Sequence, residues 1–369
     1  AAGAATTLEL FFDLVSVIAI AAVTAGLHHA INEGHGIEAL PRFVFIFVAI
    51  WWAWMNFTWF ASAFDNDDVP YRILVMVIMG GELMFAGGVG YFFDTLDFSI
   101  GIVGWVVMRV GMVGLWLRAA AGSTEYRTTC LRYALGITLA QIGWVVFFLL
   151  ASRGGTDFFL WGTVVFLIEF SVPVWAENAR ATPFHRHHII ERYGLLMIIS
   201  LGEILLPISI GFGSIAEGDG SGAILVTSIS ALVIVFAAWW VYFCEQEHLP
   251  SARVPVALLW GYGHVFVFLA AALLGAALAA EIDANGHHGS ATPAEIGRWL
   301  GGGLALYALA LWVVRDLLHA LPPVRQVALP GMAILFLLAG ALGAPSWAFA
   351  GLCVLMVAWR APWASNGPI

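Results

Sequence analysis

The chain has 369 residues, of which 61% are hydrophobic and only 11% charged, and its mean hydropathy is +0.91. Soluble domains carry about 25% charged residues, so this composition excludes an ordinary soluble protein. The formal net charge of -9 argues against nucleic acid as a partner. Apolar runs of about 20 residues recur throughout, and this is the length that a helix needs to cross a bilayer. We therefore expect an all-α polytopic membrane protein in contact with the lipid bilayer.

The apolar runs predict about twelve transmembrane helices. The last two are short and could form one re-entrant pair. Three Gly- and acid-rich segments, near 32–39, 213–222 and 281–296, are expected to be surface loops. In chain order the expected spans lie near 8–30, 40–64, 70–92, 98–118, 128–151, 156–176, 188–211, 222–246, 254–280, 297–318, 324–342 and 346–360.

Arginine placement predicts the orientation, because positive residues gather in cytoplasmic loops. With both termini in the cytoplasm, the outer side holds only Arg42, Arg153 and Arg298, and Arg109 lies within a span. The cytoplasmic side then holds eleven, namely Arg72, Arg118, Arg127, Arg132, Arg180, Arg186, Arg192, Arg253, Arg315, Arg325 and Arg360. A multi-pass protein of a bacterial inner membrane is the expected location.

The two halves of the chain, 1–181 and 182–369, look related by an ungapped offset of 182 residues. With six spans in each half, both halves would run in the same direction and form two parallel six-helix repeats. Chance matching among apolar helices explains aromatic and glycine matches easily, but it explains ionisable matches poorly. The matched positions are Glu9 with Glu191, Phe11 with Tyr193, Phe60 with Tyr242, Asp65 with Glu247, Asn66 with His248, Gly81 with Gly263, and Glu82 with His264.

Three segments resemble the bacterial low temperature requirement A family. They are "TLELFFDLVSVIAI" (7–20), "WFASAFDNDDVPYR" (59–72) and "ERYGLLMIISLGE" (191–203). The resemblance implies a polytopic inner-membrane protein and no particular chemistry. Ser16 departs from the family pattern, where a large apolar residue is expected. This small residue is expected to loosen the packing near Asp13.

Several ionisable residues fall inside the expected spans, where an ionised side chain costs several kcal/mol. Such groups need partners, a proton, a cation or a wet cavity. Arg109 and Glu169 are expected to pair, and Arg192 and His264 to neutralise two of the other carboxylates. The remaining acid surplus is a candidate set of proton donors. That set is Glu9 and Asp13 on one helix face, with Glu82 and Glu203 near the midplane.

The stretch "DNDD" (65–68) fits the Asp-x-Asp-Asp pattern of class II terpene cyclases. In that interpretation Asp67 protonates carbon, while Asp65 and Asp68 tune it and Glu82 lies deeper in the same pocket. The carbocation would need aromatic faces, which the preceding "AIWWAWMNFTWFASAF" (49–64) offers. The expected substrate-binding residues are Trp52, Trp59, Phe60, Arg72, Arg192 and His264. The substrate would be a prenyl or other apolar molecule, with Arg72 and Arg192 holding its anionic group and Mg²⁺ present only with a diphosphate.

A proton- or cation-coupled transporter or channel is the alternative, because parallel repeats with midplane carboxylates are a common transporter plan. The spans are poor in Ser, Thr, Asn and Gln, which argues against a polar substrate. Because the aromatic segment adjoins the acid cluster, we favour the membrane-embedded acid catalyst over the transporter. Two weaker signals remain. "HRHHIIER" (185–192) indicates a headgroup anchor or a metal site, and "EQEH" (245–248) holds one Glu-x-x-His unit. No metal ligand is assigned.

Overall fold

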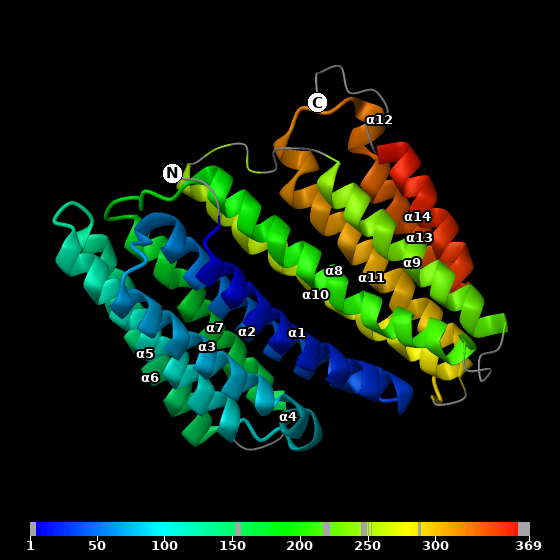
Figure 1. Ribbon diagram of the computed structural model, residues 1–369, viewed down its shortest axis with the longest axis horizontal. Coiled ribbons are helices and arrows are strands. Elements are labelled where there is room, and N and C mark those ends of the chain that lie inside the picture. The colour runs from blue at the N-terminus through cyan, green and yellow to red at the C-terminus, as the bar shows by residue number, and fades with distance from the viewer. Residues whose placement is uncertain are drawn as a thin grey trace. The chain divides into compact units, whose positions relative to one another are not determined.

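The computed structural model describes residues 5–151, 156–216, 222–244, 249, 251, 253–286 and 289–360, and every regular element among them is a helix (Figure 1). The fourteen α-helices are α1 Thr7–Asn32, α2 Gly36–Phe64, α3 Val69–Gly87, α4 Val89–Thr95, α5 Ser99–Gly122, α6 Arg127–Leu150, α7 Thr156–Glu177, α8 Arg186–Ala216, α9 Gly222–Phe243, α10 Val254–Asn285, α11 Pro293–Val314, α12 Pro323–Gln326, α13 Ala328–Ala341 and α14 Ser346–Arg360. A short 3-10 helix, Asp316–Leu318, follows α11.

Eleven segments of the described chain are long and apolar enough to cross a membrane, with α3 and α4 counted as one. This confirms the predicted all-α polytopic class and eleven of the expected spans. The twelfth, α14, has 15 residues. At 1.5 Å per residue it measures about 22 Å, which is shorter than the roughly 30 Å hydrocarbon core. The three predicted loops are shorter than expected, because α2 begins at Gly36, α8 extends to Ala216 and α10 extends to Asn285.

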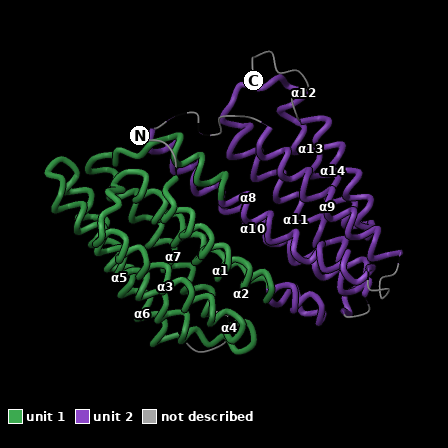
Figure 2. The backbone as a smooth tube through the Cα atoms, in the orientation of Figure 1, with its two compact units in different colours: residues 1–26, 40–195 green, residues 27–39, 196–369 purple. Residues whose placement is uncertain are grey.

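The chain divides into two compact units, drawn in different colours in Figure 2. Unit 1 consists of residues 1–26 and 40–195, and unit 2 of residues 27–39 and 196–369. Helices α1, α2 and α8 each contribute residues to both units. The halves 1–181 and 182–369 stay a prediction.

The helices follow a similar neighbour order inside each unit. In unit 1, α3 packs on α5, α5 on α6, and α6 on α7. In unit 2, α10 packs on α11, α11 on α13, and α13 on α14, which also packs on α9. This is the order that a duplicated six-helix unit would produce. The repeat itself remains a prediction.

Helix α2 supplies much of the core of unit 1. Its Trp51, Trp52 and Trp54 are all fully buried, with at most 2% of each side chain exposed. The Trp52 ring packs on Phe170 of α7, with ring centroids 4.5 Å apart. The aromatic residues of this segment are therefore mainly core packing, which fills the space between α2 and its neighbours.

Candidate functional site

A buried ion cluster joins the start of α1 to the start of α8 within unit 1. Arg192 Nη1 donates to Glu9 Oε1 at 2.8 Å, and its Nη2 and Nε donate to the two oxygens of Asp13 at 2.5 and 3.1 Å. All three side chains are at most 1% exposed. One cation is thus shared by two carboxylates. Arg192 was expected to neutralise one of the acids, with His264 neutralising another, and it contacts two of them.

Local structure fixes both carboxylates. Thr6 and Glu9 form a capping box at the start of α1, in which Thr6 N donates to Glu9 Oε2 at 2.8 Å and Glu9 N donates to Thr6 Oγ1 at 3.3 Å. Asp13 lies one turn further along the same face and accepts a hydrogen bond of 2.6 Å from Trp54 Nε1. His188 Nε2 lies 3.1 Å from Glu9 Oε1 and supplies a second basic group. The cluster therefore holds two acids, one arginine and one histidine.

Glu82 lies deeper in the same unit and is 0% exposed. Its Oε2 accepts a hydrogen bond of 3.1 Å from Ser16 Oγ, one turn beyond Asp13 on α1. Asp13 also acts electrostatically on Glu82. The Ser16 hydroxyl thus joins the Glu82 carboxylate to α1. The expectation that Ser16 loosens the packing near Asp13 stays a prediction.

No base pairs with Glu82 among the described residues. Its second oxygen, Oε1, is buried and has no hydrogen-bond partner in the described part of the chain. An ionised carboxylate in this position is costly, and Arg192 and His188 already contact Glu9. A proton or a bound cation must therefore cancel the charge of Glu82.

The acidic loop between α2 and α3 is built mainly from caps and exposed ion pairs. Asp68 is the N-cap of α3 and accepts from Tyr71 N at 2.9 Å, and its carboxylate also pairs with Arg118 at 2.6 Å. Asp67 has a left-handed backbone (φ 46°) and pairs with Arg72 through two hydrogen bonds of 2.8 and 2.9 Å. The side chain of Asp67 is 47% exposed.

The three loop acids differ in pKa. The hydrogen bonds from Arg72 lower the pKa of Asp67, and those from Arg118, followed by the Tyr71 N–H, lower the pKa of Asp68. Partial desolvation raises the pKa of Asp65, and the nearby negative charge of Glu9 adds to this effect. Protonation of carbon needs a desolvated strong acid, whereas Asp67 is hydrated and paired. Asp65 is therefore the loop acid that holds a proton most readily, and it interacts electrostatically with Glu9 of the buried cluster.

Comparison with known proteins identifies the family of this chain. The model of the bacterial low temperature requirement A protein family matches residues 4–361, which is nearly the whole chain. The chain belongs to the low temperature requirement A family. It is also 26% identical over 337 residues to an uncharacterized protein of Rhizobium meliloti (strain 1021), and this match covers 85% of this chain and 78% of the relative.

The three segments that resemble the low temperature requirement A family contribute to one place in unit 1. The first, 7–20, supplies Glu9, Asp13 and Ser16 on α1, and the third, 191–203, supplies Arg192. The second, 59–72, supplies the loop acids, whose member Asp65 acts electrostatically with Glu9 and His188. Segments far apart in the sequence therefore build one polar region of this family member.

The aromatic candidates lie apart from one another. Trp59 donates from Nε1 to the Tyr193 hydroxyl at 3.1 Å and packs on Phe184. Phe60 packs edge-on against Trp116 of α5, with centroids 4.8 Å apart. Trp52 faces α7, as described above. These rings pack on different helices, and their role in substrate binding stays a prediction.

A second buried pair lies on α5 and α7. Arg109 Nη2 is 2.6 Å from Glu169 Oε1, as expected from the sequence, and Trp144 Nε1 donates to Glu169 Oε2 at 2.5 Å. The Arg109 guanidinium also lies over the Trp105 ring, 4.2 Å from its centroid. This pair is internally neutral, so it supplies no charge to balance Glu82.

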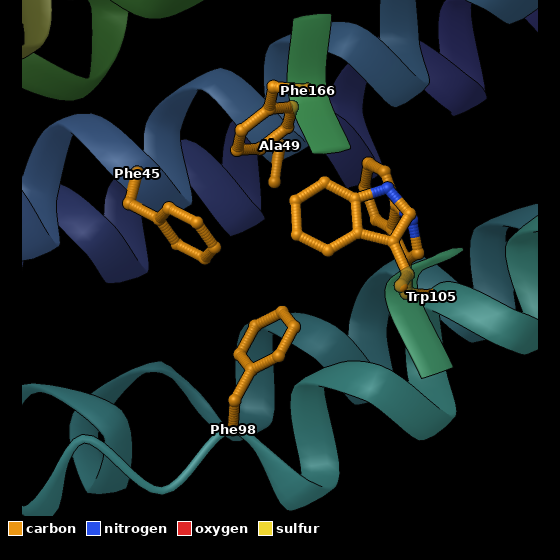
Figure 3. Close-up of a pocket in the computed structure, with 6 residues that line it drawn as sticks. Phe45, Ala49, Phe98, Trp105 and Phe166 are labelled. Carbon is orange, nitrogen blue, oxygen red and sulfur yellow. The ribbon is translucent and has the colours of Figure 1, made fainter. Parts of the chain in front are cut away.

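Beside this pair is a small gap between aromatic side chains, too narrow to hold a water molecule. In Figure 3 the rings of Phe45, Phe98 and Trp105 point toward this space. The lining residues are Phe45, Ala49, Phe98, Trp105, Trp144 and Phe166. No acidic loop residue lines it, so it is a dry part of the core and is separate from Asp67.

The other two predicted deep residues lie in unit 2. Glu203 on α8 is half-buried and has no hydrogen bond or ion pair within the described residues. His264 on α10 is buried, and its Nδ1 lies 2.8 Å from the Trp260 carbonyl oxygen. The unit "EQEH" (245–248) lies outside the described residues. Of the predicted site residues, the interior acids and bases that the structure brings together lie in unit 1. Unit 2 has a buried ion cluster of its own, in which Asp316 pairs with Arg315 at 2.8 Å and with Arg360 at 2.7 Å.

The sequence did not single out Tyr71 or Trp54, and it assigned Ser16 a different role. Only Ser16 gave a usable signal, since it follows Asp13 by three residues on α1. Among the described residues, no group of three or more His, Cys, Asp or Glu side chains lies together as a metal site. Glu82 with one hydroxyl offers too few oxygens for a divalent cation, which takes six or more. The arrangement is suited to holding and passing a proton.

Proposed function

We propose that this membrane protein is a gated proton carrier or proton-coupled transporter whose proton pathway enters unit 1 at the loop between α2 and α3. The pathway runs from Asp65 to the Glu9 and Asp13 cluster and ends at Glu82. The supporting observation is Glu82, a fully buried carboxyl group with one hydrogen bond. Among the residues that the structure describes, its second oxygen has no partner and no base lies beside it.

The spacing of the polar groups supports this pathway. Glu9, Asp13 and Ser16 follow one another at about one helical turn along α1, and Ser16 contacts Glu82 directly. Each of these groups can accept or donate a proton. A proton would pass between neighbouring carboxylates with Arg192 and His188 offsetting the negative charge.

The far side of Glu82 supports gating. Beyond Glu82, the buried residues include Phe43 and Phe47 on α2, Phe85 on α3, and Val89 and Phe92 on α4. A layer of packed apolar side chains does not hydrate a proton or a metal ion. A proton at Glu82 would leave on that side only after the helices move, which favours a gated carrier over an open pore.

The proposal is tested by proton flux in proteoliposomes. The purified chain is reconstituted with a trapped pH-sensitive dye, and a valinomycin-driven potassium diffusion potential provides the driving force. We expect flux from the wild type and its loss in Glu82→Gln. Glu281→Gln is the matched control, since Glu281 is a buried acid of unit 2 that accepts from Thr227. Equal flux from wild type and Glu82→Gln, or no flux above empty vesicles, would overturn the proposal.

Acid catalysis on a prenyl substrate is the competing function, and Asp65 is the loop acid with the raised pKa. Incubating the same membranes with farnesyl or geranylgeranyl diphosphate tests it directly. Under the proton-pathway proposal no cyclised product forms. A cyclised product that disappears in Asp67→Asn would replace the proton-pathway proposal with the catalytic one.

A further inference from the structure

The ends of α1 and α10 bring three polar side chains together in unit 2. His28 and Asn32 lie one turn apart at the end of α1, and Asp283 lies in the last turn of α10. Asp283 Oδ2 lies 2.8 Å from His28 Nε2 and 2.8 Å from Asn32 Nδ2, and these two nitrogen atoms are 3.1 Å apart. The three atoms therefore form a triangle in which each contacts the other two.

Hydrogen bonds cannot satisfy all three sides of this triangle. An ionised carboxylate only accepts, an amide nitrogen only donates, and a histidine ring nitrogen does one or the other. If His28 Nε2 carries a proton, it donates to Asp283 but faces the Asn32 nitrogen as a second donor. If it carries none, it accepts from Asn32 but faces the Asp283 oxygen as a second acceptor. One side of the triangle brings like groups together in either case.

The Asn32 amide has a second unsatisfied atom. Its Oδ1 is buried and has no hydrogen-bond partner among the residues that the structure describes. A half-turn about the Cβ–Cγ bond exchanges Oδ1 with Nδ2 and brings this oxygen into the triangle. The backbone stays in place, because the Asn32 carbonyl oxygen accepts from Ser290 N at 3.1 Å. His28 Nε2, Asp283 Oδ2 and Asn32 Oδ1 would then direct three lone pairs at one point.

The spacing of these atoms matches one face of an octahedral metal site. Ligand atoms about 2.1 Å from a metal ion lie about 3.0 Å apart in an octahedron and about 3.4 Å apart in a tetrahedron. The sides of the triangle, 2.8, 2.8 and 3.1 Å, agree with the octahedron. One imidazole with two oxygen atoms suits a divalent first-row transition metal, and Mn²⁺ prefers octahedral sites rich in oxygen.

The surroundings of the triangle favour a cation and leave it within reach of water. Helix α1 ends at Asn32 and α10 ends at Asn285, so both helices direct the negative end of their dipoles at this place. The side chains of His28 and Asp283 are 28% and 37% exposed. Water can therefore reach the three coordination positions that the protein does not fill.

We propose that His28, Asn32 and Asp283 bind a divalent transition metal ion such as Mn²⁺, with water at the other three positions. The third protein ligand is an amide oxygen, which a search for His, Cys, Asp and Glu clusters does not find. The bound ion would join α1 to α10 within unit 2. This site is independent of the proposed proton pathway, whose residues belong to unit 1.

Titration with Mn²⁺, followed by electron paramagnetic resonance, tests the site. The chain is purified in detergent without a histidine tag and treated with a chelator. We expect one bound Mn²⁺ per chain and a higher Tm in its presence. Asp283→Asn and His28→Gln should weaken binding by at least about a hundredfold, since even the loss of an outer-shell partner costs about 10–100-fold. No bound Mn²⁺ in the wild type, or equal binding in Asp283→Asn, would overturn the site.

His29→Gln is the matched control, because His29 is exposed at the same end of α1 and faces Glu33 at 3.2 Å. This variant should keep both the bound Mn²⁺ and the rise in Tm. If it loses as much binding as His28→Gln, scattered surface histidines bind the ion and the proposal is wrong.

Asn32→Asp separates a metal site from a hydrogen-bond network. The change removes the amide donor and adds a carboxylate, so the Tm without metal should fall. Mn²⁺ should bind this variant at least as tightly as the wild type and should restore its Tm. A lowered Tm that Mn²⁺ does not restore would show that Asn32 acts there as a donor, and the metal site would be rejected.

Discussion

At the scale of single residues, Arg192 balances the charge of the buried cluster. Its guanidinium meets Glu9 on one side and Asp13 on the other, and none of the three side chains is more than 1% exposed. Two carboxylates around one cation leave a formal negative charge, which His188 can offset when it is protonated. Removal of any one of these charged groups would therefore leave another buried charge without its partner.

Replacing Arg192 by Gln should destabilise the protein by about 3 to 5 kcal/mol, because it leaves two buried carboxylates without their main partner. Thermal unfolding in detergent measures this loss. The triple variant that adds Glu9→Gln and Asp13→Asn should be more stable than the single variant, because it no longer buries unpaired charge. Equal stability of the single and triple variants would contradict this account of the cluster.

The lowered pKa of Asp68 should make the free energy of unfolding depend on pH. The hydrogen bonds from Arg118 and the Tyr71 N–H lower its pKa in the folded chain, below the value near 4 of an unfolded one. The unfolded chain therefore binds more protons on acidification. The contribution of Asp68 is fully present above about pH 4 and is lost as the pH falls through the folded pKa.

Asp68→Asn isolates this charge, since asparagine is also a good N-cap residue. We expect the Tm of the wild type to fall more steeply than that of Asp68→Asn as the pH is lowered from about 4 to about 3. A series of thermal unfolding curves between about pH 6 and 3 provides the measurement. Parallel curves for the two proteins would show that the pair with Arg118 does not stabilise the fold.

At the scale of elements, helices α3 and α5 approach each other closely beside the site. A Cβ atom added to Gly81 would lie 2.7 Å from the Gly104 carbonyl oxygen and 2.7 Å from Met108 N. Small residues at such crossings let helix backbones pack closely in membranes. Gly81 precedes Glu82, so this contact also sets where the carboxylate meets Ser16.

Gly81→Ala should therefore cost about 1 to 3 kcal/mol through overpacking. Gly80→Ala is the matched control, because nothing lies within 4 Å of its added Cβ. That change should be neutral or stabilising by up to about 1 kcal/mol, since alanine has the higher helix propensity. Thermal unfolding of both variants gives the comparison, and similar Tm values for the two would contradict the close packing of α3 on α5.

The sequence predicted the helices well and their pairing poorly, for different physical reasons. Hydropathy marks a span wherever about 20 apolar residues follow one another, so eleven expected spans are confirmed. Contacts such as Glu9 with Arg192 join residues more than 180 apart, and nothing local encodes them. Arg109 and Glu169 were predictable as a pair because deep charges of opposite sign are scarce. The direction of each aromatic ring on α2 was not, since that helix is apolar on all sides.

At the scale of the whole molecule, the direction of the proposed proton pathway depends on which side of the membrane the loop at Asp65 faces. Arginine counts of eleven against three predict that this loop lies in the cytoplasm. The apolar layer beyond Glu82 would then face the outside. Proton entry from the cytoplasm therefore depends on an orientation that labelling can decide.

Single cysteines at opposite ends of the α3–α4 segment test this orientation. Cys130, Cys244 and Cys353 are first replaced by alanine, and then Asn66→Cys or Thr95→Cys is introduced at an exposed position. In cells whose outer membrane has been permeabilised and whose inner membrane is intact, a membrane-impermeant maleimide should label Thr95→Cys. It should leave Asn66→Cys unlabelled until the inner membrane is also permeabilised. The reverse pattern would place Asp65 outside and reverse the direction of proton entry. Labelling of both from one side would show that α3–α4 does not cross the membrane.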